Sequence, residues 1–458
     1  MVNSERFHTF ALINCLYNQS FLYNMSKKEH KLVTVITVGF ALFAMFFGAG
    51  NLILPPYIGL LSGSEWAMAL VGFFVTAILA PFVGVLTVAR VGTGFSDLMA
   101  KFPMWLTVAI HFLVILCIGP LVAIPRTGAT TYEVGVRPLF PEISNVVFAV
   151  IFFAVVLVLS ISKSRIVDVI GKYLTPVLLL FLVLLVCCGI LFPINEVEPT
   201  SFTGVDAFVF SFKEGYQTLD VLASVIFAGI IISAITNKGY TTHHERMRLA
   251  IWSGVVSTLC LLFIYGGLIY LGATTDYVAE GQVARTQLLL HISHTVLGRY
   301  GTIVIACAIA FACLTTAIAL TSAMGSFAQQ LTKGWISYKV GVVICTLISL
   351  VLSINEVDAI IKYAGNILLF IYPIVFTVIL YVLFFNKYVN DRVPYLLSVI
   401  TTALISSVAV LQNFGVCPEW LSQMKASIPL SSYSLEWLLP SFVVFVVSAF
   451  IVNSLRKR

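Results

Sequence analysis

The sequence predicts an all-α integral membrane protein with twelve transmembrane helices, ten of them in two five-helix repeats of opposite orientation. Three observations support this fold class. Of the 458 residues, 60% are apolar and only 10% are charged, whereas a soluble domain carries about 25% charged residues. The apolar residues gather in runs long enough to cross a bilayer. Lys and Arg alternate between the intervening segments, as they do in multi-pass proteins.

Twelve apolar runs follow one another along the chain, and a spanning helix needs about 20 such residues. The runs lie at 33–61, 66–90, 104–125, 144–161, 166–192, 216–236, 248–272, 299–331, 337–354, 357–385, 393–412 and 436–455. The amphipathic segment 280–301, between the seventh and eighth runs, is too short to span. We expect it to lie along the membrane surface.

Lys and Arg predict the orientation, because cytoplasmic segments carry an excess of positive charge. With the N-terminus inside, 19 of the 26 Lys and Arg residues fall on cytoplasmic segments and 7, including Arg126, on outer ones. An omitted or additional helix would spoil this alternation. Both termini are therefore expected in the cytoplasm.

The N-terminal segment 1–30 does not belong to the first run. It lacks a continuous apolar region and a cleavage site, so it is not a convincing signal peptide. Met25, followed by SKKEHK, looks like a more natural start. We expect 1–30 to be a cytoplasmic tail or to include an over-extended start.

Spans 1 to 5, within 31–192, and spans 6 to 10, within 193–385, form the two expected repeats, and 386–458 adds two helices. Because five is odd, the second repeat enters the membrane from the opposite side, as in many secondary transporters. The first helix of each repeat is interrupted in such folds. We expect breaks at the GAGN sequence at 48–51 and, on a weaker signal, at 227–229.

An interruption exposes backbone groups in lipid, where each unpaired group costs several kcal/mol. Carbonyls near Ala44–Phe47 would face a cation, and N–H groups near Ala49–Leu52 would face an anion. We expect Pro55 and Pro56 in the first turn of the second half-helix. Such a site suits a zwitterionic amino acid and a coupling ion. The alternative is that small residues at 48–50 only permit tight helix packing.

Span 8 contains Ala312, Thr315 and Thr316 near one helical face. Two neutral hydroxyls and a free carbonyl would form an uncharged oxygen site suited to Na⁺. The alternative is that the hydroxyls bond back to the preceding turn of their own helix.

Four motifs carry a family resemblance: GAGNLILPP in span 1, GPLVAIPRTGAT in span 3, GYQTLDVLA in span 6 and ACLTTAIALTSA in span 8. With these motifs the chain from Met25 onward resembles the bacterial branched-chain amino acid:cation symporters. That family lies in the amino acid/polyamine/organocation superfamily. The resemblance implies a leucine-transporter-type fold and Na⁺-coupled uptake of leucine, isoleucine and valine, with no cofactor.

The resemblance also implies the ligands of one Na⁺: the carbonyls of Ala44, Phe47 and Ala312 and the hydroxyls of Thr315 and Thr316. A second Na⁺, where the fold binds one, would use Asn51, although its other ligands have no clear match here. The substrate carboxylate is implied near Ala49 and Gly50.

The expected substrate pocket is mainly apolar and has no basic group for an acidic side chain, which favours an aliphatic substrate. One methylene changes binding by only about 1–3 kcal/mol, so leucine, isoleucine and valine should all be accepted. The expected lining residues are Phe46, Gly48, Ala49, Gly50, Asn51, Asp220, Ser224, Phe227, Ala228 and Gly229.

Asp220 is the one acidic residue expected within a span, and such residues are functional candidates. It could bind the substrate ammonium, contribute to coupling, or pair with Arg126 as an outer gate. The alternative is that Asp220 lies only one turn deep and is hydrated from outside.

These observations predict a symporter in the bacterial inner membrane, with a branched-chain amino acid, Na⁺ and the lipid bilayer as its partners. The alternatives are an H⁺-coupled transporter of the same fold and a channel or membrane-bound enzyme. The sequence has no nucleotide-binding loop, metal-ligand cluster or catalytic triad, so we do not expect an enzyme. The net charge of +6 does not indicate a nucleic-acid partner.

Overall fold

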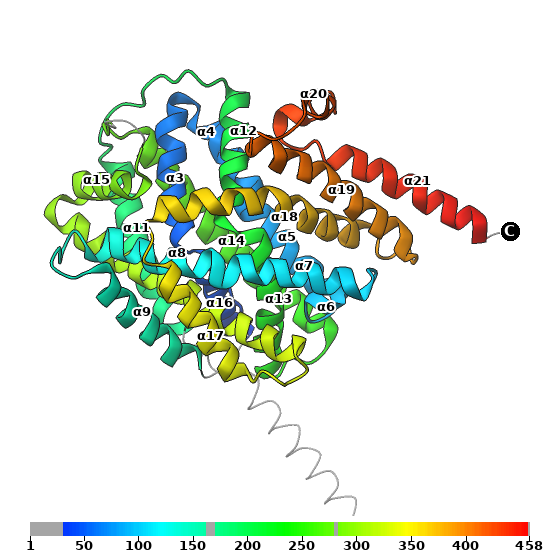
Figure 1. Ribbon diagram of the computed structural model, residues 1–458. Coiled ribbons are helices and arrows are strands. Elements are labelled where there is room, and N and C mark those ends of the chain that lie inside the picture. The colour runs from blue at the N-terminus through cyan, green and yellow to red at the C-terminus, as the bar shows by residue number, and fades with distance from the viewer. Residues whose placement is uncertain (1–30, 162–169, 279–282, 457–458) are drawn as a thin grey trace, which may run out of the picture.

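The computed structural model describes residues 31–161, 170–278 and 283–456, and every regular element within these ranges is a helix. The helices form one bundle with a peripheral C-terminal group (Figure 1). The expected tail at 1–30 lies outside the described residues.

The helices of the N-terminal half are interrupted at several points by short π-helical or 3₁₀ turns. They are α2 (Lys31–Phe46), α3 (Ala49–Ser62), α4 (Trp66–Phe74), α5 (Ala80–Val91), α6 (Phe95–Leu98), α7 (Met104–Leu116), α8 (Ala123–Thr130), α9 (Asn145–Ser160) and α11 (Thr175–Leu191).

The helices of the C-terminal half include the longest in the protein. They are α12 (Gly204–Glu214), α13 (Asp220–Asn237), α14 (His243–Ala273), α15 (Arg285–Leu297), α16 (Gly301–Leu331), α17 (Tyr338–Leu352), α18 (Val357–Phe385), α19 (Arg392–Asn413), α20 (Glu419–Ala426) and α21 (Leu438–Arg456).

Nine segments of the described ranges are long and apolar enough to cross a membrane, judged by length and composition. Helices α2, α9 and α17 are apolar but shorter. In the described part of the chain, each of the twelve expected runs coincides with helical structure. The number of membrane crossings stays a prediction.

The third helical segment is longer than expected, running over Met104–Val136 rather than 104–125. It bends within the π-helical turn Cys117–Leu121, where Gly119 has non-helical φ and ψ angles of −91° and −123°. The following Pro120 lacks an N–H for the helical ladder, which explains the bend. The extension carries α8, with its arginine, into the protein interior.

Helix α14 packs along both α2 and α3. The contact with α3 is backbone to backbone: a Cβ atom on Gly59 would lie 1.9 Å from the carbonyl oxygen of Ile269, and one on Gly272 would lie 2.0 Å from that of Pro56. Helix α12 packs on α4, and α13 packs on α5. Helices α2–α5 and α12–α14 therefore form one packed group.

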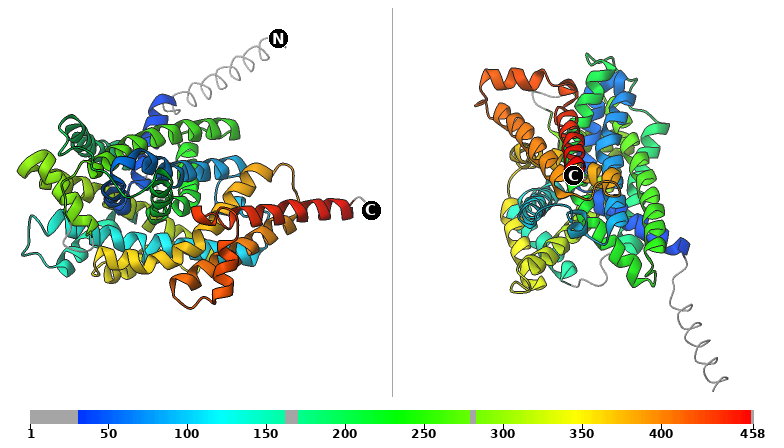
Figure 2. Two further views of the ribbon diagram at one scale, coloured as in Figure 1. Left: turned by 90° about the horizontal axis from the view of Figure 1, so that it is seen from above. Right: turned by 90° about the vertical axis from the view of Figure 1, so that its right-hand side faces the viewer.

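Helix α16 lies against α8, α9, α11 and α17, and it meets the first group at α2. Helices α19 and α21 pack on each other, and α19 packs on α18. Figure 2 shows α19–α21 along one side of the molecule. The two additional C-terminal helices thus lie outside the region where the two groups meet.

Candidate substrate and ion site

The first helix interruption separates α2 from α3. Helix α2 ends at Phe46, Gly48 is extended with φ −106° and ψ −165°, and α3 begins at Ala49. A Cβ atom on Gly48 would lie 3.2 Å from the side chain of Thr316, so glycine allows the interruption to approach α16 closely. The break expected in this motif is confirmed at Gly48, although residues 49–51 are already helical.

Pro55 and Pro56 lie within α3, so the expectation that they occupy its first turn is wrong. A proline inside a helix removes the N–H that would bond the carbonyl four residues earlier. The carbonyls of Asn51 and Leu52 therefore have no partner in the helical ladder. The prolines extend the irregular backbone beyond the break itself.

Two hydroxyls of α16 meet the C-terminal end of α2. The Thr315 hydroxyl lies 3.1 Å from the carbonyl oxygen of Ala44 and 2.9 Å from that of Ala312. The Thr316 hydroxyl lies 3.2 Å from the oxygen of Ala44 and 3.4 Å from that of Met45. Each hydroxyl has one proton and can donate to only one of its two neighbours at a time. The alternative of a bond back to the same helix explains the contact of Thr315 with Ala312, but it does not explain the contact of Thr315 with Ala44.

These oxygens fit a small hard cation, because such ions take carbonyl and hydroxyl ligands. The carbonyl end of α2 also carries the negative end of the helix dipole. Four of the five predicted ligand residues converge here. The described structure records no contact from the fifth, Phe47, to these hydroxyls. Its ring instead stacks on Tyr265 with the centroids 5.7 Å apart.

The second interruption lies at Leu219, and the expected break at 227–229 is wrong. Helix α12 and a 3₁₀ turn run from Gly204 to Thr218, Leu219 is left-handed with φ 68° and ψ 5°, and α13 starts at Asp220. The expected run 216–236 therefore omits the first half of this broken helix.

Phe227, Ala228 and Gly229 lie inside α13. A glycine costs a helix only about 1 kcal/mol relative to alanine and does not by itself break it. Gly229 has a packing role instead, since a Cβ atom there would lie 3.2 Å from the carbonyl oxygen of Thr93. The left-handed Leu219 is the strained position, at a cost of about 1–3 kcal/mol.

Asn51 links the two interruptions. Its side-chain amide donates a hydrogen bond of 2.6 Å to the Asp220 carboxylate and a second one to the hydroxyl of Tyr265. All three side chains are buried. The alternative that Asp220 is hydrated from outside is therefore wrong. Tyr265 of α14 was not predicted, because a tyrosine within an apolar run gives no signal beyond its need for a buried partner.

Arg126 of α8 is only 2% exposed and lines a cavity between the two interruptions, so the expectation of a pocket without a basic group is wrong. Its Nη1 donates to the backbone oxygen of Gln217 at 2.8 Å. A Cβ atom on Gly50 would lie 2.6 Å from its Nη2. No ion pair within 4 Å joins Arg126 to Asp220 in the described part of the chain, so the predicted pairing is not formed in this conformation.

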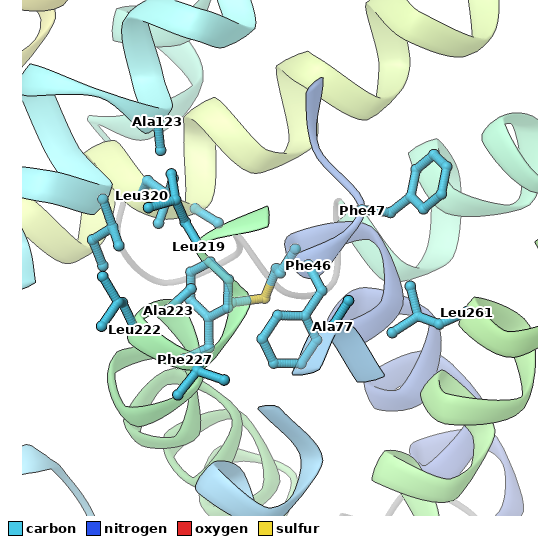
Figure 3. Packing of buried hydrophobic residues seen from close by; sticks show 14 of the residues in the cluster. Phe46, Phe47, Ala77, Ala123, Leu219, Leu222, Ala223, Phe227, Leu261 and Leu320 are labelled. Atoms are coloured by element: carbon cyan, nitrogen blue, oxygen red, sulfur yellow. The ribbon is translucent and has the colours of Figure 1, made fainter. Parts of the chain in front are cut away.

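A small cavity of about 20 Å³ lies between the two interruptions, with room for about one water molecule. Figure 3 shows the rings of Phe46 and Phe227 close to each other, with Leu219, Leu320 and Ala123 nearby and Phe47 pointing away. The rings of Phe46 and Phe227 have centroids 5.6 Å apart. The cavity is lined by Met45, Phe46, Gly48, Ala49, Asn51, Ile118, Ala123, Arg126, Thr127, Thr218, Leu219, Asp220, Ala223, Phe227, Thr316 and Leu320.

Four of the ten predicted pocket residues, Gly50, Ser224, Ala228 and Gly229, do not line this cavity. The Ser224 hydroxyl donates to the carbonyl of Val221 at 2.7 Å and faces α5. Gly50 contributes indirectly, because it makes room for the arginine. The second break lies at Leu219, before the predicted position. Ala228 and Gly229 are therefore too far from the break along α13 to reach the cavity.

Arg285 of α15 contacts three other helices, two of them through ion pairs. Arg285 Nη2 lies 3.3 Å from Glu214 of α12, and Nη1 lies 3.7 Å from Asp358 of α18. The guanidinium also lies 4.4 Å from the ring centroid of Tyr57 on α3. Asp276 lies in the loop before α15, and its hydrogen bond with His291 of α15 lowers the pKa of the Asp276 carboxyl group. One face of α15 is buried, as an amphipathic helix requires.

The sequence profile of the family described as "Branched-chain amino acid transport protein" matches residues 31–455. This chain belongs to that family. It is 35% identical to the branched-chain amino acid permease BraB of Bacillus subtilis, over 90% of this chain and 94% of that protein. It is 31% identical to the permease BrnQ of Haemophilus influenzae, over 92% and 98%. The family resemblance is confirmed, and the chain is a transporter-family protein rather than an enzyme.

Solved transporters share the fold at low sequence identity. A closed nucleobase-cation-symport-1 transporter, Mhp1, aligns with a TM-score of 0.57 at 14% identity, over 91% of this chain and 93% of its own. MhsT in complex with L-phenylalanine aligns with a TM-score of 0.57 at 15% identity, over 90% and 98%. A Na⁺-coupled sialic acid symporter gives 0.58 at 12%, over 91% and 89%. The leucine-transporter-type fold is thereby confirmed.

Proposed function

We propose that this chain imports leucine, isoleucine and valine together with Na⁺ by alternating access. One observation carries the proposal: the carbonyl of Ala44, at the end of α2, lies within 3.2 Å of the hydroxyls of both Thr315 and Thr316. Thr316 also lines the cavity between the two interruptions. An ion at these oxygens would therefore lie next to a bound substrate, and each would favour the other.

The cavity has the chemistry to bind an aliphatic amino acid. The N–H groups of Ala49 and Gly50 begin α3 and carry the positive end of its dipole. The Asp220 carboxylate offers an acceptor for the ammonium group. Phe46 and Phe227 supply apolar surface for the side chain. Asn51 is already bonded to Asp220, so a second Na⁺ at Asn51 would have to displace that bond.

The packing of the helices supports alternating access. The group α2–α5 with α12–α14 contains both interruptions, whereas α8 and α16 belong to the opposing group. The cavity is too small for a leucine side chain, so the substrate must enter through a rearrangement that separates the two groups. A membrane potential of 100 mV supplies about 2.3 kcal/mol per charge, which supports about 50-fold accumulation for one Na⁺.

We further propose twelve spans, with inverted repeats at 31–192 and 193–385 and two helices in 386–458. The positive-inside distribution of Lys and Arg supports cytoplasmic termini. A bacterial inner membrane is the setting in which such an importer would use a Na⁺ gradient.

H⁺ coupling is the second candidate, and one observation favours it. Asp220 is 2% exposed and lies at the second interruption instead of near the outer surface. A buried carboxyl group at such a position could carry a proton. The hydroxyls of Thr315 and Thr316, by contrast, do not titrate and suit only a cation.

The test is uptake of labelled L-leucine into proteoliposomes that contain the purified full chain. An inward Na⁺ gradient at constant pH should drive accumulation, and an inward H⁺ gradient in Na⁺-free buffer should not. Accumulation with H⁺ alone would refute Na⁺ coupling. Counterflow by internal unlabelled leucine would separate a carrier from a channel, and empty liposomes provide the background.

A further inference from the structure

Arg126 is a buried cation with most of its donors unused. The side chain has five N–H donors, and in the described part of the chain it makes one hydrogen bond, from Nη1 to the oxygen of Gln217. Its Nε is buried without a partner. Asp220 is near enough to attract the guanidinium electrostatically, but no carboxylate of the described residues forms an ion pair with it within 4 Å. A buried charge without such a pair is costly, so this arrangement indicates a partner that is not part of the chain.

The guanidinium lies at the point where an anion would also meet the start of α3. Arg126 lines the cavity, and its Nη2 would be 2.6 Å from a Cβ atom on Gly50. Any side chain at position 50 would therefore displace it. The first N–H groups of α3 have no helical acceptor, and they begin at Ala49, which lines the same cavity. Two independent sets of donors thus meet there.

We infer that Arg126 binds the carboxylate of the transported amino acid, together with the first N–H groups of α3. This inference rests on the proposed function and deepens it. Asp220 lies on the same cavity without an ion pair to Arg126 and is available for the ammonium group. The site therefore recognises α-amino acid zwitterions by a buried pair of opposite charges, and its apolar wall accepts the side chain.

Arginine suits this role better than lysine. Its planar group can bond both oxygens of a carboxylate at once, whereas a lysine ammonium acts as a point charge. The bond from Nη1 to Gln217 fixes the group between the two interrupted helices. Binding of the carboxylate would then join α3, α8 and the turn before α13, and it would favour the closed arrangement of the two groups.

Wild-type protein and leucine analogues test the charge recognition without any mutation. Binding to the purified full chain in NaCl is measured by competition with labelled L-leucine. Leucinamide lacks the carboxylate and therefore loses the hydrogen bonds to the charged guanidinium. It should compete about 10- to 150-fold more weakly than leucine. Leucinamide that competes as well as leucine would overturn the inference.

Variants separate carboxylate binding from a purely structural role. Arg126→Gln should weaken leucine binding about 10- to 150-fold and leave leucinamide within about threefold of wild type, and Arg126→Lys should partly restore leucine binding. Equal loss for leucine and leucinamide would assign Arg126 to positioning only and overturn the inference. The exposed Arg137, at the end of the same helical segment, provides the matched control as Arg137→Gln.

Failure of the two proposals can be distinguished. If the wild-type chain neither binds nor accumulates leucine, the proposed function fails and the carboxylate site with it. If the wild type accumulates leucine and accepts leucinamide equally, only the assignment of Arg126 fails. A variant that does not fold leaves the wild-type analogue series to decide.

Discussion

Thr315→Val should lower the affinity for the Na⁺ that drives transport without altering the fold. The substitution removes the hydroxyl that lies 3.1 Å from the Ala44 oxygen and 2.9 Å from the Ala312 oxygen. It keeps a branched side chain at a position with no solvent exposure. An interaction between a hydroxyl and an ion contributes about 1.5–3 kcal/mol. The Na⁺ concentration for half-maximal leucine uptake should therefore rise about 10- to 150-fold.

The assay is leucine uptake into proteoliposomes at varied Na⁺, with choline keeping the ionic strength constant. Thr315→Ser retains the hydroxyl and should stay within a few-fold of wild type. Thr321→Val is the matched control, because Thr321 lies on the same helix, is fully buried and has an unpartnered hydroxyl. An unchanged Na⁺ requirement in Thr315→Val would refute the assigned ion site.

Two further predictions concern packing and charge. Gly272→Ala should destabilise the protein by about 1–3 kcal/mol or more, since its Cβ would lie 2.0 Å from the Pro56 oxygen. Gly266→Ala on the same helix meets only ordinary contacts and should melt like wild type; equal melting temperatures for the two variants would contradict the backbone packing of α3 on α14. Arg285→Gln removes the cluster with Glu214, and a partly exposed ion pair contributes up to about 1 kcal/mol. The melting temperature should therefore fall less than in Gly272→Ala; an equal or larger fall would mean that the cluster contributes more than a partly exposed ion pair.

The parts of the site that sequence predicts are those with a local signal. The GAGN motif predicts the first interruption because a glycine, which has no side chain, lets the chain approach a neighbouring helix closely. Thr315 and Thr316 predict a cation site, which stays a prediction, because two adjacent hydroxyl residues stand out in an apolar helix. Each of these features depends on a few consecutive residues, so its position in the sequence can be predicted without knowledge of the tertiary packing.

The second interruption could not be found in this way. Leu219 adopts a left-handed conformation that leucine disfavours, whereas Gly229 is the residue that resembles a breaker and lies in a regular helix. Tertiary packing explains this glycine, because a Cβ atom on Gly229 would make a tight contact with the carbonyl oxygen of Thr93. The low helix propensity of glycine therefore predicts the second break about two to three turns after its actual position at Leu219.

The polar contacts across the site join residues that are far apart in sequence. Asn51 bonds Asp220 and Tyr265, which are 169 and 214 residues away, so neither pairing has a local signature. The sequence predicts Arg126 on the outer side, because the apolar run that precedes it ends at this first charged residue. The helical segment instead continues to Val136, and this continuation buries the arginine beside the interruptions.

The most direct measurement is an experimental structure of the full chain with bound L-leucine and Na⁺. We expect the leucine carboxylate within hydrogen-bonding distance of the N–H groups of Ala49 and Gly50, and an ion between the Ala44 oxygen and the Thr315 hydroxyl. Leucine bound elsewhere, for example in the apolar groove of about 260 Å³ that Phe148, Phe152 and Leu314 help to line, would contradict it.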